Sequence, residues 1–88
     1  MDQAVIRHLP EQHCFVLDFA GHQARLDYQL STDAAGHAVQ VNFTHTFVPE
    51  AARGQGLAEQ LVRAGLNWAR TQQLQMVASC WYVAKFLR

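Results

Sequence analysis

The segment between residues 48 and 58 combines residue types that can bind an anion. It carries Arg53 and glycines at 54 and 56, and it stands between a stretch with the period of a β-strand and one with the period of an α-helix. The first N–H groups of a helix have no partner inside it and its dipole favours negative charge, so backbone alone can hold a phosphate there. The segment lacks the lysine of a P-loop and the third glycine of a dinucleotide fingerprint, which argues against a nucleoside triphosphate or NAD site.

Three stretches that precede this segment show the period of two that is typical of β-strands. Residues 14–20 and 24–30 alternate, and the turn at Gly21 and His22 between them predicts a hairpin. The apolar faces of these two stretches hold Phe15, Leu17 and Phe19, and then Ala24, Leu26, Tyr28 and Leu30. After loop residues 31–36, a third strand begins at His37 and ends before Pro49.

The third strand has the clearest alternation, and it places a histidine among apolar residues. We expect Val39, Val41, Phe43 and Phe47 to share one face with His45, and Gln40, Asn42, Thr44 and Thr46 to share the other. A hydrogen-bonded structural histidine is the common explanation for such a position, and a functional one is the alternative.

The period then changes to that of a helix over residues 56–71. Its apolar stripe holds Leu57, Ala58, Leu61, Val62, Gly65, Leu66 and Ala69. Residues 76–78 predict one more strand, and residues 81–87 a short terminal helix. This order predicts a mixed α/β sheet in which the long helix links two strands that could lie parallel.

Length and composition favour a single small globular domain over residues 1–88. Half of the residues are apolar and 16% are charged, and seven basic residues balance seven acidic ones. No overall field therefore favours nucleic acid or an anionic membrane, and no apolar stretch approaches the ~20 residues of a membrane-spanning helix. With two cysteines, no C-x-x-C pair and no cationic leader, we expect a cytoplasmic protein with reduced thiols, either a monomer or a homodimer.

The glycine segment resembles a known coenzyme-binding motif. Its sequence from Arg53 to Ala58 matches the Q/R-x-x-G-x-G/A motif of the GNAT N-acetyltransferase superfamily, after a strand that ends Phe47-Val48-Pro49. The resemblance implies acetyl-CoA as the cofactor, with its pyrophosphate held by Arg53, Gly54, Gln55, Gly56, Leu57 and Ala58. It also implies that backbone groups near Phe47 and Val48 meet the pantetheine arm.

Two further segments narrow this resemblance. Residues 45–49 (His-Thr-Phe-Val-Pro) and 80–83 (Cys-Trp-Tyr-Val) are similar to those of small, single-domain GNAT-like proteins that lack the helices inserted after the first strand in other members. The resemblance runs from about residue 13 to the C-terminus, although Ala78 stands where these proteins commonly carry proline. It implies a minimal GNAT-like α/β fold: a mixed, mostly antiparallel sheet, one long helix after the central strand and a short C-terminal helix.

The resemblance implies two alternative mechanisms of acetyl transfer to an amine that the sequence does not identify. In the direct route, the amine attacks the thioester and Tyr82 protonates the departing thiolate. In the covalent route, Cys80 accepts the acetyl group first and His45 helps to deprotonate it. Two other interpretations involve no catalysis. The chain could be a CoA-binding or sensor module without turnover, or a structural domain whose glycine turn holds no ligand.

The remaining cysteine, histidines and tryptophans have simpler explanations. We interpret Cys14 as a packing residue. The other histidines (His8, His13, His22 and His37) are expected in loops and turns without metal-ligand spacing, so we predict no metal. We interpret Trp68 and Trp81 as core or rim aromatics because the sequence has no basic face for nucleic acid.

Overall fold

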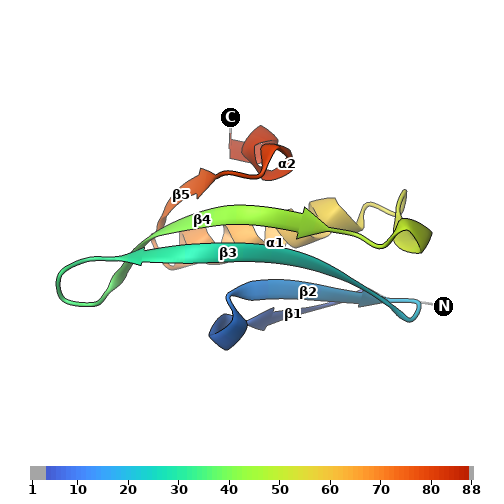
Figure 1. Ribbon diagram of the computed structural model, residues 1–88, viewed down its shortest axis with the longest axis horizontal. Helices are drawn as coiled ribbons and strands as arrows, with labels where there is room; N and C mark the ends of the chain where they lie inside the picture. The colour runs from blue at the N-terminus through green and yellow to red at the C-terminus, as the bar shows by residue number, and fades with distance from the viewer. Residues whose placement is uncertain (1–3, 88) are drawn as a thin grey trace.

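The computed structural model describes residues 4–87, in which five strands form one sheet with a long helix against it (Figure 1). The strands are β1 (Val5–Leu9), β2 (Cys14–Phe19), β3 (His22–Thr32), β4 (Ala38–Phe47) and β5 (Gln75–Ala78). The helices are α1 (Leu57–Thr71) and α2 (Trp81–Ala84), with short 3-10 turns at Pro10–Gln12, Glu50–Ala52 and Lys85–Leu87. The strands lie in sequence order, and all neighbours are antiparallel except β4 and β5.

This architecture confirms the mixed, mostly antiparallel α/β fold expected from the sequence. The β2–β3 hairpin turns at Ala20 and Gly21, whose φ angles are 50° and 80°. Two successive residues with positive φ give the turn whose twist matches that of the flanking strands. The turn therefore lies one residue earlier than predicted.

Strand β1 was missed by the sequence analysis. It is five residues long and lacks a clear alternation of apolar and polar side chains, yet all of it pairs with β2. His8, which we expected in a loop, lies in this strand: its ring stacks on Phe15 at 4.1 Å, and its Nε2 is 2.6 Å from Tyr28 Oη. His22, also expected in a turn, is the first residue of β3.

Helix α1 buries the apolar stripe that its period predicted, except Ala58, which is only partly buried. Leu57, Leu61, Val62, Gly65, Leu66 and Ala69 are all buried, most of them against the sheet. A Cβ built at Gly65 would lie 2.8 Å from Leu26 Cδ2 and 3.0 Å from Phe43 Cε1. The helix therefore lies too close to β3 and β4 for a larger residue to fit without a shift.

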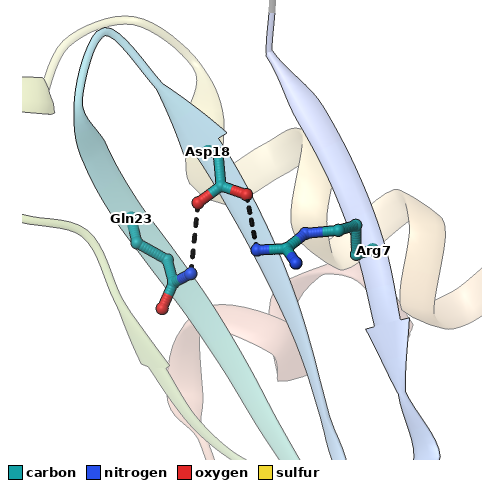
Figure 2. Close-up of polar contacts among 3 residues, drawn as sticks. All are labelled: Arg7, Asp18 and Gln23. Carbon is teal, nitrogen blue, oxygen red and sulfur yellow. Dashed lines mark hydrogen bonds and ion pairs between the residues drawn. The ribbon is translucent and has the colours of Figure 1, made fainter.

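The face of β1–β3 opposite to the helix is held by polar contacts that cross three strands (Figure 2). Arg7 in β1 donates to Asp18 in β2 at 2.7 Å, and Gln23 in β3 donates to the other oxygen of the same carboxylate at 3.1 Å. These side chains are exposed, so the contacts align the strands more than they stabilise them.

Between residues 4 and 87, no helix has both the length and the hydropathy that crossing a lipid bilayer requires.

Candidate functional site

A β-bulge interrupts the pairing of β4 with β3 near the end of β4. Phe43 pairs with Tyr28 and His45 pairs with Asp27, which leaves Thr44 as an extra residue. Directly opposite residues in an antiparallel pair share a face, and Tyr28 belongs to the core while its neighbour Asp27 lies on the other face. His45 therefore lies on the face away from Phe43. Our prediction that these two residues share a face is wrong, because a strict period of two does not allow for an extra residue.

The same bulge turns Thr46 toward the helix side of the sheet. Thr46 pairs with Leu26, a fully buried core residue, and its Oγ1 lies 3.6 Å from Cys80 Sγ. The alternation along β4 predicted Thr46 on the polar face, so its contact with Cys80 was not predicted. No sequence signal that we used marks the bulge, so this residue could not have been found from the alternation.

The turn between β4 and α1 exposes backbone N–H groups. Gly54 and Gly56 have φ angles of 84° and 73°, a region that other residues rarely adopt. Gly56 caps α1, and no side chain of the described residues caps the first N–H groups of the helix. A Cβ built at either glycine meets no atom within 4 Å, so a ligand has room to approach. This arrangement fits an anion such as a pyrophosphate.

Arg53 precedes this turn, and its side chain folds back onto the chain. Its Nε donates to the carbonyl oxygen of Val48 at 3.0 Å. Among residues 4–87, no hydrogen bond from its two terminal nitrogens is found, so the outer edge of the guanidinium is available to an anion.

A pocket of about 820 Å³ joins this turn to the end of β4 and the start of α2. In Figure 1, β4 leads into the turn at the right-hand end, and α2 lies above the middle of the sheet. Every predicted site residue lines the pocket except Gln55. The predicted residues that do so are His45, Phe47, Val48, Arg53, Gly54, Gly56, Leu57, Ala58, Cys80 and Tyr82, and the structure adds Thr44, Thr46, Ala52, Ser79 and Trp81.

Cys80 is a partly buried free thiol at the start of α2. Burial raises the pKa of this thiol, but hydrogen bonds to the sulfur from the Val83 backbone, the Thr46 hydroxyl and the backbones of Tyr82 and Thr46 outweigh it. The pKa of Cys80 therefore lies below its usual value. A lowered pKa increases the fraction of reactive thiolate at neutral pH.

Tyr82 lies two residues further along in the same pocket. Burial raises the pKa of its phenol, and the nearby Glu59 carboxylate raises it further. The Lys85 ammonium lies 4.6 Å from the centroid of the Tyr82 ring. The phenol is therefore protonated at neutral pH and can donate a proton.

The other residues singled out in the sequence lie outside the pocket, apart from Trp81. Cys14 is fully buried, as expected of a packing residue. Trp68 packs against His8 and Tyr28, whereas Trp81 lies on the rim of the pocket with 74% of its surface exposed. Within the described part of the chain, no three His, Cys, Asp or Glu side chains are placed to hold a metal ion.

Comparison with known proteins identifies the family. A family model described as GCN5-related N-acetyltransferase matches residues 14–88, which include the whole pocket. The chain belongs to this family.

This member of the GCN5-related N-acetyltransferase family is similar in sequence to vertebrate proteins named NATD1. The protein NATD1 of Bos taurus is 40% identical over 48 residues, which is 54% of this chain and 42% of that protein. The human protein NATD1 is 38% identical over 48 residues, again 54% of this chain and 42% of that protein. The alignments thus span less than half the length of these relatives.

Solved structures share the fold of this family member. An acetyltransferase of Trypanosoma brucei superposes with a TM-score of 0.54 and 19% identity over 88% of this chain and 60% of that one. An integron cassette protein of V. cholerae superposes with a TM-score of 0.55 and 17% identity over 84% of this chain and 47% of that one. At these identities the likeness shows the fold alone.

Proposed function

We propose that this chain is an acetyltransferase domain that binds acetyl-CoA in the pocket beside Cys80 and transfers the acetyl group to an amine. One observation carries the proposal: a single pocket joins the start of α1, which has a glycine at its N-cap, to the sulfur of Cys80 and the phenol of Tyr82. Members of the GCN5-related N-acetyltransferase family generally use acetyl-CoA, which supplies an activated thioester.

The backbone around the pocket offers two binding regions for this coenzyme. The N–H groups of residues 54–58, together with Arg53, would hold the pyrophosphate. The ladder between β4 and β5 ends at Phe43 and Ala78, so residues 44–47 have no strand partner on that side within the part of the chain that the structure describes. Their peptide groups, up to Phe47 and Val48, would pair with the amides of the pantetheine arm.

In the direct route, Tyr82 acts as the general acid. The amine attacks the acetyl carbon, the bond from that carbon to the CoA sulfur breaks, and Tyr82 gives its proton to the leaving thiolate. The nitrogen then loses the extra proton, which returns to the Tyr82 phenolate, so that an amide and the thiol of CoA are released. The raised pKa of Tyr82 supports this role, because the phenol keeps its proton until it is needed.

In the covalent route, the Cys80 thiolate attacks the acetyl carbon and CoA leaves as a thiolate. The amine then attacks the Cys80 thioester, the bond from carbon to the Cys80 sulfur breaks, and the proton lost by nitrogen protonates the CoA thiolate. Thr46 and the backbone of Val83 stabilise the thiolate that must attack. His45 lines the pocket as the proposed base, but no hydrogen bond joins it to Cys80 among the described residues. Thr46 supports this route more directly than His45.

A second candidate function is a CoA-binding or sensor module without turnover. The pocket lining contains no Asp or Glu among residues 4–87, so no carboxylate there could remove a proton from an ammonium acceptor. This observation favours binding without transfer, unless His45 or bulk water takes the proton.

Thermal denaturation with and without acetyl-CoA, together with intact-mass measurement, tests the proposal. Ligand at ~100 times its dissociation constant adds about 2.7 kcal/mol to the free energy of unfolding, which raises the Tm by several degrees. A shift with an acetyl adduct on Cys80 supports the covalent route, and buried Cys14 is the internal control. A shift without an adduct leaves direct transfer or the binding module, which an assay with added amines separates. No shift overturns the proposal.

A further inference from the structure

The chain just beyond β5 is held by a side chain of β4 and not by a strand partner. The ladder ends at Ala78, and the next N–H, that of Ser79, donates to Asn42 Oδ1 at 2.9 Å. Asn42 Nδ2 donates in turn to Ser79 Oγ at 3.0 Å. One carboxamide therefore uses its donor and its acceptor on a single residue of the pocket wall.

These contacts hold Ser79, the residue before Cys80. Strand β4 also holds Cys80 itself through two further contacts. The N–H of Cys80 donates to the carbonyl oxygen of Phe43 at 3.1 Å. Its sulfur then lies 3.6 Å from Thr46 Oγ1. Three residues of one strand thus hold the segment at its backbone and at its sulfur, with the bulge at Thr44 between them.

We propose that Asn42 is a positioning residue that sets the place of the Cys80 sulfur in the pocket. It acts through Ser79 and does not line the pocket itself. Without the carboxamide, the N–H of Ser79 loses its partner and the segment between β5 and α2 can rotate. The sulfur then moves relative to Thr46 and to the backbone of α2. The importance of this role for catalysis rests on the proposed function, because only chemistry at Cys80 requires the sulfur to be placed.

The test is the pH dependence of Cys80 alkylation by iodoacetamide, measured by peptide mass spectrometry so that Cys14 is scored separately. In Asn42→Ala, we expect alkylation at neutral pH to slow by roughly threefold or more and the midpoint of the profile to move to higher pH, because the thiolate fraction falls. Ser79→Ala keeps the backbone bond and should change the profile less. Gln29→Ala alters the exposed residue that pairs with Asn42 in β3, and this variant should leave the alkylation profile of Cys80 unchanged.

Two outcomes overturn the proposal. One is a lowered Tm of Asn42→Ala with an unchanged alkylation profile, which indicates a structural role alone. The other needs no variant: rapid hydrogen exchange of the Ser79 amide in the unaltered protein would show that Asn42 does not hold it. Alkylation requires no acetyl-CoA, so these results stand apart from the thermal-shift test of the proposed function.

Discussion

Thr46 Oγ1 lies 3.6 Å from Cys80 Sγ, although 34 residues separate the two in the chain. The bulge at Thr44 brings them together, because it moves Thr46 to the helix side of β4. The Thr46 hydroxyl is one of the groups that lower the pKa of the thiol.

Thr46→Val should therefore make Cys80 less reactive at neutral pH. The valine keeps the branched shape but cannot hydrogen-bond the sulfur, so the pKa of Cys80 should rise and its alkylation should slow roughly threefold. Alkylation reactions quenched at several times, at each of a series of pH values, give the midpoint of the pH profile of Cys80. Thr44→Val is the control, since its hydroxyl donates to Asp27 and not to the sulfur. Equal midpoints in both variants would contradict the stabilising contact.

Gly56→Ala should weaken acetyl-CoA binding. An alanine at a φ of 73° is strained by about 1 kcal/mol, and its Cβ enters the space from which the coenzyme would approach. We expect a loss of roughly tenfold in affinity, the equivalent of one hydrogen bond to a charged group. Isothermal titration measures it directly.

Gly36→Ala is the matched control for this variant. Gly36 has a φ of 87° and equally open surroundings, but it lies in the β3–β4 turn, at the opposite end of the long hairpin from the glycine turn (Figure 1). It should lose similar stability and keep its affinity. An equal loss of affinity in both variants would mean that backbone strain, and not lost contact between the glycine turn and the coenzyme, explains the effect.

Tyr82→Phe distinguishes the two routes of transfer. If Tyr82 is the general acid, kcat should fall about 10²-fold while the affinity for acetyl-CoA stays the same. Because burial and Glu59 raise the pKa of Tyr82, the rate that depends on this phenol should begin to decline only at a higher pH than an ordinary tyrosine would give. Steady-state kinetics over pH measure both quantities. An unchanged kcat would exclude Tyr82 as the acid and favour the covalent route.

The burial of His8 should make stability depend on pH. Burial lowers the pKa of His8, and Glu11 offsets this only in part. The unfolded chain, with a histidine pKa near 6.5, then binds more protons than the folded one just below that value. The free energy of unfolding should therefore fall as the pH drops through 6.5 toward the folded pKa.

Urea denaturation at a series of pH values measures this dependence. His8→Gln should flatten the decline below pH 6.5, since glutamine does not titrate in this range. His22→Gln, at the start of β3, is the control and should keep the slope of the unaltered protein. An unchanged slope in His8→Gln would assign the pH dependence to other groups.

Local patterns in the sequence predicted the main elements and most of the candidate site. The period of two gave β2 and β3, and the period of 3.6 gave α1 with its buried stripe. The spacing of Gly54 and Gly56 before an amphipathic helix predicted the glycine turn at the start of α1. These features depend on residues that are close in the chain, and neighbouring side chains are enough to reveal them.

Only the tertiary structure decided how the elements meet at the pocket. The bulge at Thr44 arises from pairing between distant strands, and it reverses the faces that alternation assigned to His45 and Thr46. Asn42 and Ser79, which hydrogen-bond to each other, are likewise distant in the chain. Strand β1 also forms only through its pairing with β2. The sequence determined which groups can do chemistry. Strand register, which depends on all the strands at once, decided which of them meet the sulfur.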